Sequence, residues 1–439
     1  MRHTLSLWLA FFFCLMPCAS VRAADGLPKR PNVLFILSDD QRWDTIRAVG
    51  NKEIHTPNLD RLVESGFRFN NAFCMGSMVP AVCLPSRTML ITGRSLWHLP
   101  KENTVKVPPG VVLLPQLLND AGYETFHCGK QSNACRYGNA TFTTNIETKK
   151  GGAETMTEHA DRVIKFVDGH KRDKPFFVYL APPVPHDPRV APPEFMKMYD
   201  PAKLTLSKNF MPKHPFDNGE LSVRDEKLAP VPRTEEEMRR HLADYYACIS
   251  DFDHQFGRIL EALKNQGLAA NTIIVFSSDH GLAVGGRHGL MGKQNLYEHN
   301  KPPLIVAGPG IPHGQSNALV YLFDLFPTLS DLAGAKTPEA VEGKSLMPIV
   351  KGEKTKHRDY LFCAYRDCQR MVRDDRWKLI RYNAGGVKNV QLFDLKSDPD
   401  EVINLAADPM HTAQKEKLDR LLTEARKGFG DPVDFDGHK

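Results

Sequence analysis

The hydrophobic and polar residues of this chain form two kinds of segment that alternate along most of its length. Short, almost unbroken apolar runs lie within residues 33–37, 123–129, 174–181, 271–281 and 302–310. Runs of this kind are typical of strands that are buried on both faces of a parallel sheet. Longer segments between them carry apolar residues at helical spacing. The pattern therefore predicts a repeating strand–helix order.

The longer, amphipathic segments are expected to be helices. They cover residues 56–66, 111–122, 153–170, 235–267 and 321–334. The longest, 235–267, has a single apolar face made of Leu242, Tyr245, Tyr246, Ile249, Phe252, Phe256, Leu260 and Leu263. Together with the strands, these helices predict an α/β fold in which a large, mostly parallel sheet is sandwiched by helices.

The pattern changes after residue 345. Residues 346–439 contain short strand-like runs and then a helical segment over 410–428, which predicts a small antiparallel sheet with one helix packed against it. We therefore expect a catalytic domain at 24–345 and a C-terminal subdomain at 346–439. Within the larger domain, residues 187–235 are rich in proline but punctuated by aromatic and apolar residues. We expect them to form an ordered insertion that carries function.

The N-terminus and the overall charge indicate where the protein acts. Residues 1–23 combine a basic start, an apolar core and a small-residue cleavage site, as in a secretory signal peptide. The apolar run is shorter than the ~20 residues of a membrane-spanning helix. We expect a soluble, exported protein in a periplasm or outside the cell, with no membrane span. The net charge of +5, without clustered basic tracts, argues against a nucleic-acid partner and weakly favours an anionic substrate.

Acidic residues follow two of the expected strands. Asp39 and Asp40 come after the first strand, and Asp279 and His280 come after the strand at 271–281. Ligands of parallel sheets gather at the carboxyl ends of the strands. Three carboxylates brought together there would be costly unless neutralised, so they predict a divalent cation. Oxygen ligands suit Ca²⁺ or Mg²⁺, although His280 is unusual for either.

Cys83 is a second candidate for chemistry. Without the signal segment the chain keeps an odd number of cysteines, so at least one thiol is left over in an oxidising compartment. Pro85 fits the first turn of a helix, which would place Cys83 at the positive end of the helix dipole and near Arg87. Both influences would lower the pKa of the thiol. On these features alone, a buried or disulfide-linked cysteine is the favoured interpretation.

The complete motif around Cys83 is more specific. "CLPSRTMLITGR" resembles the C-x-P-S-R-x-x-x-x-T-G-R signature of the type I, formylglycine-dependent sulfatases of the alkaline phosphatase superfamily. The segments "PNVLFILSDDQRWD", "GYETFHCGK", "PFFVYLAPPVPHDP" and "SSDHGLAVGGRHGLMGKQNLYE" are similar to other parts of the same family, as is the C-terminal "RWKLIRYN…QLFDLKSDPDEVINLA". The resemblance covers essentially the mature chain and implies an alkaline-phosphatase-like fold.

The resemblance also implies a role for each matching residue. Cys83 would be converted to formylglycine by a formylglycine-generating enzyme, and its hydrate would attack sulfur. The ligands of a divalent cation, usually Ca²⁺ with Mg²⁺ or Mn²⁺ as alternatives, would be Asp39, Asp40, Asp279, His280 and an oxygen of residue 83. Arg87 and Lys130 would stabilise the charge on the hydrate. His186 and Lys293 would contact the sulfate, as Lys130 would, and either His186 or Lys293 would protonate the leaving alcohol.

The sequence departs from the family in two places. Ser132 stands where many members have a histidine that activates the hydrate, so either Ser132 takes a lesser hydrogen-bonding role or another group, such as His127, supplies the base. We expect His127 mainly to pack. Lys301 replaces a usual arginine.

Four further residues are candidates for substrate contacts. His98 and His288 are expected to line the pocket, and Asp187 and Arg189 to form a sugar-binding subsite. The favoured activity is hydrolysis of a sulfate ester, on a sulfated carbohydrate or another small molecule. The alternatives are a phosphonate monoester or phosphodiester hydrolase of the same fold, and a glycan-binding pseudoenzyme.

Overall fold

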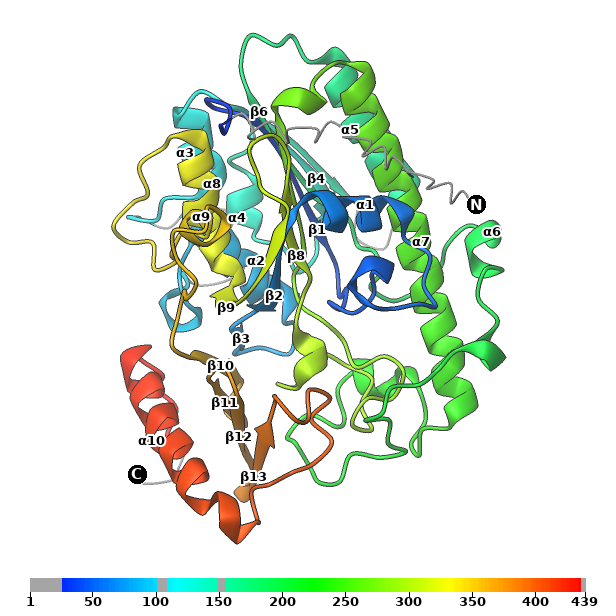
Figure 1. The fold of residues 1–439 in the computed structure, drawn as a ribbon, viewed down its shortest axis with the longest axis vertical. Coiled ribbons are helices and arrows are strands. Elements are labelled where there is room, and N and C mark those ends of the chain that lie inside the picture. Colours follow the sequence, from blue (N-terminus) through cyan, green and yellow to red (C-terminus); the bar gives the residue numbers. More distant parts are fainter. Residues whose placement is uncertain (1–25, 101–106, 108, 149–154, 436–439) are drawn as a thin grey trace, which may run out of the picture.

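The computed structural model describes residues 26–100, 107, 109–148 and 155–435. The expected signal segment at 1–23 lies outside these ranges. The described chain forms a large sheet covered by helices and a smaller sheet with one helix beside it, as the sequence predicted (Figure 1). None of the helices in these ranges is long and apolar enough to cross a bilayer.

The large sheet has eight strands in the order β5-β4-β6-β1-β7-β8-β2-β9. Neighbouring strands from β5 to β7 are parallel, β8 is antiparallel to both of its neighbours, and β2 and β9 are parallel. The bounds are β1 Asn32–Ser38, β2 Phe67–Phe73, β4 Glu124–Lys130, β5 Thr144–Thr148, β6 Phe176–Ala181, β7 Thr272–Ser278, β8 Leu304–Ala307 and β9 Gly314–Tyr321. All five strands expected from apolar runs are present.

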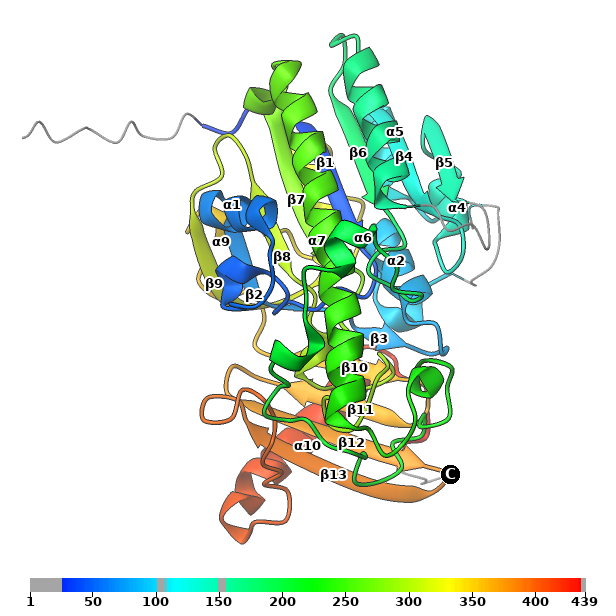
Figure 2. The ribbon, with the colours of Figure 1, turned by 90° about the vertical axis from the view of Figure 1, so that its right-hand side faces the viewer.

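Helices cover both faces of this sheet (Figures 1 and 2). On β1, Leu34 and Ile36 pack into a core shared with α1, α5 and α7, whereas Phe35 and Leu37 pack into a second core shared with α2, α3, α8 and α9. A strand whose side chains enter a core on both sides must be apolar throughout, which explains its unbroken apolar run. The helices are α1 Pro57–Ser65, α2 Cys83–Thr92, α3 Leu114–Asp120, α4 Arg136–Asn139, α5 Met156–Gly169, α6 Pro193–Met196, α7 Glu235–Asn265, α8 Leu325–Ala333 and α9 Met347–Val350.

The sequence analysis gave no strand for β2, β5 or β9. Their sequences, "FRFNNAF", "TNIET" and "GQSNALVY", mix polar with apolar residues. β5 and β9 are the two edge strands and β2 lies next to β9. Each of the three has positions that are only partly buried, so an apolar run is not required. Thr56 stands at the N-cap of α1. Its hydroxyl, however, contacts the Asp60 side chain instead of capping the helix.

The small sheet has the order β13-β12-β11-β10-β3. Its strands are β10 Leu361–Tyr365, β11 Gln369–Arg373, β12 Trp377–Ala384 and β13 Val387–Asp394, which pair antiparallel, and β3 Gly76–Ser77, which pairs parallel with β10. Helix α10 (Thr412–Gly428) lies beside this sheet (Figure 1). β3 comes from the segment just before Cys83, so the small sheet is tied to the neighbourhood of that residue. The domain boundary at 345/346 stays a prediction.

The insertion at 187–235 is ordered, but it contains little regular structure. Its elements are α6 and two short 3₁₀ turns, at Pro201–Lys203 and Asp225–Leu228. Tyr199 and Leu204 pack in a core against α7. The insertion therefore lies on the long helix and does not form a separate domain.

The strand register brings the two acidic clusters together. β1 and β7 are adjacent and parallel, and their last residues, Ser38 and Ser278, are paired. The N–H of Asp279 donates to the carbonyl oxygen of Ser38 at 3.2 Å. Residues 39 and 279 therefore leave the same edge of the sheet side by side, as the sequence predicted.

A buried ion pair holds the C-terminus to the small sheet. Arg370 on β11 binds both carboxylate oxygens of Asp431 at 2.6 and 3.0 Å, and both side chains are 0% exposed. Arg370→Met leaves the buried Asp431 carboxylate with Arg426 as its remaining cation, at 3.1 Å, so we expect the free energy of unfolding to fall by about 1–3 kcal/mol in urea denaturation. Arg376 pairs with Asp394 in the same two-bond geometry but is 55% exposed. Arg376→Met is the matched control, and we expect it to lower the free energy of unfolding much less, because the exposed pair is screened by water. Equal losses would contradict the prediction.

Candidate active site

The carboxylates of Asp39, Asp40 and Asp279 and the side chains around them form one cluster, the centre, which lies where β1 and β7 end. Asp39 and Asp40 directly follow β1, and Asp40 has a left-handed backbone (φ 69°) that is rare for residues other than glycine. The Asp40 N–H donates to an Asp279 carboxylate oxygen at 3.1 Å, and its carbonyl accepts from the Tyr245 hydroxyl at 2.6 Å. These bonds stabilise the tight turn in which the two consecutive aspartates stand. All three carboxylates are buried.

Cys83 is the first residue of α2 and lies at the middle of this cluster. Its Sγ lies 3.4 Å from an oxygen of Asp39, 3.3 Å from Nε2 of His280, 3.4 Å from Nζ of Lys293 and 3.8 Å from an oxygen of Asp40. The side chain is 0% exposed. Predicted metal ligands and a predicted sulfate-binding lysine thus converge on one side-chain atom.

Three cations neutralise the three carboxylates. Arg87, one turn further along α2, donates from Nε to Asp279 at 3.0 Å. Lys130, the last residue of β4, forms an ion pair with Asp39. Lys293 donates to both oxygens of Asp40 at 2.9 and 3.0 Å. Each carboxylate therefore has its own cation, and the formal charges of these side chains cancel.

The pairs change the pKa values of the groups involved. Burial alone would raise the pKa of Asp39, but Lys130, then His186 and Arg87, hold it well below its usual value. The pKa of Asp40 is lowered in the same way against burial, mainly by Lys293. These carboxylates stay ionised, which is the state in which they would hold a cation.

The thiol behaves differently from the sequence-based expectation. Burial, and then the Asp279 carboxylate, raise the pKa of Cys83 well above the usual thiol value, outweighing Lys130 and Lys293. The expectation of a lowered pKa was wrong. Arg87 is paired with Asp279, and the expectation of a lowered pKa, which rested on helix position and Arg87, left out burial and the neighbouring carboxylates.

The cluster fits a divalent cation. Asp40, Cys83, Asp279 and His280 each offer a ligand atom, and these atoms all lie within 4.8 Å of one another. Nδ1 of His280 lies 2.9 Å from the carbonyl oxygen of Gly281, to which it donates. That bond leaves Nε2, which faces Cys83, as the unprotonated nitrogen that a metal requires. The oxygen-rich donor set suits a hard cation.

His186 lies on the more open side of the centre. Its Nε2 is 3.7 Å from an oxygen of Asp40, its Nδ1 donates to the carbonyl oxygen of Asp187 at 2.7 Å, and its side chain is 18% exposed. The bond from Nδ1 orients the ring so that Nε2 faces the centre. The structure therefore brings His186 together with Arg87, Lys130 and Lys293 around Cys83.

The other four predicted substrate residues lie in different surroundings. Asp187 forms a two-bond ion pair with Arg224. The Arg189 guanidinium lies 5.6 Å from the centre of the Tyr245 ring, and its Nε and one Nη are buried without a hydrogen-bond partner in the described part of the chain. His98 is 49% exposed and contacts Glu342, and buried His288 contacts Glu298. In the described residues, no contact joins His98 or His288 to the carboxylate cluster.

Asp225 and Glu226, which link the insertion to the loop carrying Lys293, were not predicted from the sequence. Glu226 accepts N–H bonds from Met291 and Gly292 and is paired with Arg233. Asp225 accepts from the side chain of Gln294 at 3.0 Å. The only local feature that could have indicated this link is the charged sequence "RDEK" at residues 224–227. Such a sequence in an irregular segment usually lies on the solvated surface, so it does not predict a buried contact.

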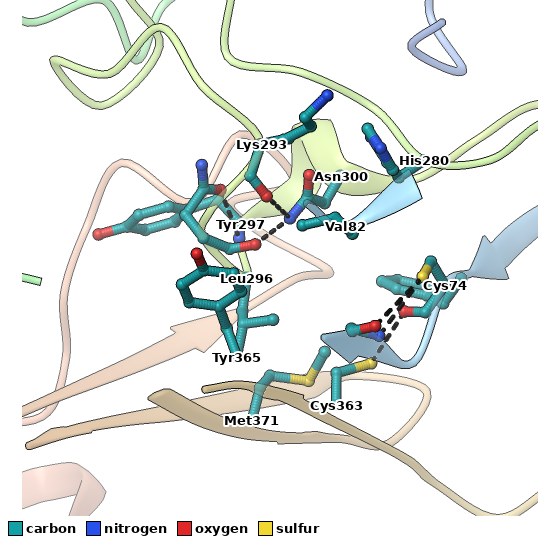
Figure 3. Close-up of a pocket in the computed structure, with 13 residues that line it drawn as sticks. Cys74, Val82, His280, Lys293, Leu296, Tyr297, Asn300, Cys363, Tyr365 and Met371 are labelled. Carbon is teal, nitrogen blue, oxygen red and sulfur yellow. Dashed lines mark hydrogen bonds between the residues drawn. The ribbon is translucent and has the colours of Figure 1, made fainter. Parts of the chain in front are cut away.

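A small pocket lies behind the centre, between it and the small sheet (Figure 3). His280 and Lys293 line one side, and Cys363, Tyr365 and Met371 line the other. The pocket shows that the small sheet contributes to the wall of the centre.

Ser132, the first departure from the family pattern, and His127, the candidate substitute base, have different surroundings. Ser132 is exposed and has no hydrogen bond to the centre among the described residues. His127 is buried, bonded to Asn145 and packed against Phe142 and Tyr179, and burial lowers its pKa to about 4. The expected packing role of His127 is confirmed.

The fold and the centre together define a class of enzyme: a hydrolase of the alkaline-phosphatase-like superfamily, with an acidic cluster at the carboxyl ends of its central strands. Residues 31–335 match the family model described as Sulfatase, and residues 286–428 match the one described as N-sulphoglucosamine sulphohydrolase, C-terminal. The chain belongs to the sulfatase family and is a sulfuric ester hydrolase.

Individual relatives are distant but span nearly the whole chain. A protein named Sulfatase from Formosa agariphila is 28% identical over 473 residues, covering 94% of this chain and 91% of that protein. The N-acetylglucosamine-6-O-sulfatase of Bacteroides thetaiotaomicron is 25% identical over 509 residues, covering 95% and 89%.

Solved structures share the fold. The phosphonate monoester hydrolase of Agrobacterium radiobacter has a TM-score of 0.77 at 22% identity, covering 91% of this chain and 96% of that one. A protein solved with its substrate D-glucosamine-2-N,6-O-disulfate has a TM-score of 0.75 at 22% identity, covering 94% and 100%.

Lys301 gives a pH-dependent prediction. Its ammonium group lies 4.3 Å from the centre of the Trp43 ring, and burial, then Arg373, lower its pKa to about 8. Because this value lies below the unfolded pKa, the charged lysine destabilises the fold at neutral pH, and the penalty is lost as the pH rises from about 8 toward about 10. The contact with Trp43 offsets part of the penalty.

We therefore expect Lys301→Met to raise the free energy of unfolding by about 1–2 kcal/mol near pH 7 and by much less near pH 10. Urea denaturation at both pH values measures the difference. Lys351→Met, at an exposed position, should change little at either pH. A Lys301→Met effect that is the same at both pH values would contradict the prediction.

Proposed function

We propose that the protein hydrolyses a sulfate ester of a sulfated carbohydrate, using a formylglycine hydrate derived from Cys83 and a divalent cation. The observation that carries the proposal is the convergence of Asp39, Asp40, His280 and Lys293 on the Cys83 sulfur. A nucleophile at that position is surrounded by groups that bind cations and by groups that bind anions.

Each protein group has a defined task in this proposal. The hydrated formylglycine would supply the nucleophilic oxygen, and the cation, held by Asp39, Asp40, Asp279 and His280, would polarise the sulfate. Arg87 and Lys130 offset the negative charge at residue 83, and Lys293 binds the sulfate oxygens.

His186 acts on the leaving group. It faces the centre from the more open side, where the alcohol part of the ester would emerge. A proton delivered from there to the ester oxygen lets an unactivated alcohol leave. Lys293 is the alternative donor.

The substrate class rests on the relatives and on the insertion. The N-acetylglucosamine-6-O-sulfatase and the protein solved with a disulfated glucosamine act on sulfated sugars, as their names state. The insertion provides Asp187, next to His186, and Arg224, which is 59% exposed. A saccharide leaving the centre would meet this surface.

Further parts of the proposal concern maturation and location. Ca²⁺ is the favoured cation, with Mg²⁺ or Mn²⁺ as alternatives. Cys83 requires a formylglycine-generating enzyme as a partner. The protein would act in a periplasm or outside the cell, and residues 1–23 would be removed as a signal peptide.

Conversion of Cys83 is the first test. When the protein is made together with a formylglycine-generating enzyme, the peptide that contains residue 83 should lose the mass difference between –CH₂–SH and –CHO, as seen by mass spectrometry. A hydrazine probe should label the same peptide through its aldehyde. Cys83→Ala is the control. Unmodified cysteine in protein produced in this way would remove the proposed mechanism.

Turnover of matched esters is the second test. The enzyme should release sulfate from a sulfated sugar faster than it releases phosphate from a matched diester; the reverse order would favour the phosphonate monoester or phosphodiester hydrolase. His186→Ala should lower kcat on the sugar sulfate by about 10²–10⁴-fold, the usual contribution of a general acid. His98→Ala is the control, because His98 contacts Glu342 on the surface. Binding of sulfated glycans without turnover would favour the pseudoenzyme.

A further inference from the structure

Charged side chains form a closed ring at the more open side of the centre. Starting from Asp40, the ring passes through His186, Asp187, Arg224, Asp225 and Lys293 and returns to Asp40. Basic and acidic side chains alternate around it. Five members are at most 18% exposed, whereas Arg224 is 59% exposed. Arg224 is therefore the point at which this buried network reaches solvent.

We propose that Arg224 is a positioning residue that fixes His186 and Lys293 relative to each other, by bridging Asp187 and Asp225. This inference rests on the proposed function, in which these two residues act on the sulfate and the leaving alcohol. Arg224 itself lies outside the carboxylate cluster.

One arm of the bridge reaches His186. The Arg224 Nη atoms donate to both oxygens of Asp187, at 2.5 and 3.0 Å, which fixes the plane of that carboxylate. Asp187 in turn holds the His186 ring through its carbonyl oxygen, 2.7 Å from Nδ1, and its carboxylate, 3.5 Å from the same atom. The orientation of the His186 ring thus depends on where Asp187 is held.

The other arm reaches Lys293. Arg224 donates from Nε and one Nη to a single oxygen of Asp225, at 3.1 and 2.7 Å. The second oxygen of Asp225 accepts from Gln294 at 3.0 Å and lies 3.9 Å from Nζ of Lys293. Arg224 therefore holds the residue that contacts both Lys293 and its neighbour.

Removing the guanidinium would leave two carboxylates facing each other without a cation between them. The two negative charges would repel each other, so the Asp187 and Asp225 side chains should move apart or bind other cations. His186 and Lys293 would be displaced in opposite directions. Misplacement of a catalytic group by about 1 Å can lower a rate by about 10²-fold. The decrease in kcat should be greatest for esters whose leaving alcohol must be protonated.

The experiment compares two esters in the full-length, matured enzyme. The nitrophenolate of 4-nitrophenyl sulfate leaves without being protonated. The alcohol of a sulfated sugar must receive a proton in order to leave. Arg224→Met should lower kcat on the sugar sulfate by about 10²-fold and on the nitrophenyl ester by less than about 10-fold. Arg224→Lys keeps the positive charge but loses the planar guanidinium that binds both carboxylates. It should therefore retain part of the rate on the sugar sulfate that Arg224→Met loses.

Arg376→Met is the matched control for loss of an exposed, two-bond Arg–Asp pair. Arg376 pairs with Asp394 and is 55% exposed, on the small sheet away from the centre. The Arg376→Met variant should hydrolyse both esters at the unaltered rates. If Arg224→Met lowers both rates equally, or changes KM alone, the inference is overturned, because Arg224 would then contact substrate or support the fold only.

A crystal structure of Arg224→Met tests the inference without activity. We expect the His186 ring or the Lys293 side chain to be displaced relative to Asp40; unchanged positions of both would overturn the inference. If the unaltered enzyme hydrolyses neither ester, the proposed function fails and the structural result still decides the role of Arg224. If it hydrolyses both and the ratio of rates survives in Arg224→Met, the inference alone fails.

Discussion

The pairing of three buried carboxylates with three buried cations is the constraint on which the rest of this structure depends. An unpaired charge left in such surroundings costs several kcal/mol, so the six side chains must arrive together. They come from distant parts of the chain: Asp39 and Asp40 from the end of β1, Asp279 from the end of β7, and the cations from α2, β4 and the loop before β8. The sheet register and the position of α2 satisfy this requirement.

The sheet and the loops contribute in different ways. β1 and β7 fix the aspartates through backbone pairing, which leaves little freedom. Lys293 lies in a loop without regular structure, and that loop is held from outside by Glu226, which takes up two of its N–H groups. The irregular insertion thus gives a loop residue the precision that strands give to the aspartates. Its small content of regular structure is compatible with that role.

Some parts of this arrangement can be predicted from the sequence, and others cannot. The apolar run of β1 predicts a strand buried on both faces, and the acidic residues after it predict a site at its end. Local pattern fixes both. The order of strands in the sheet, the raised pKa of Cys83 and the role of Asp225 depend on contacts between distant segments. The thiol illustrates the reason: helix position and Arg87 are visible in the sequence, but the burial of the thiol and then the nearby Asp279 carboxylate, which raise its pKa, arise only in the fold.

The charge balance of the centre bears on what it would hold. Without a cation, the acidic and basic side chains cancel, and a buried neutral cluster has little attraction for an anion. A divalent cation held by the aspartates would add two positive charges to this neutral cluster, which would offset the single negative charge of a sulfate ester and the charge of an ionised hydrate at residue 83. The lysines that now neutralise Asp39 and Asp40 would then be free to contact sulfate oxygens. In this arrangement, cation binding would convert Lys130 and Lys293 from partners of the carboxylates into partners of the substrate.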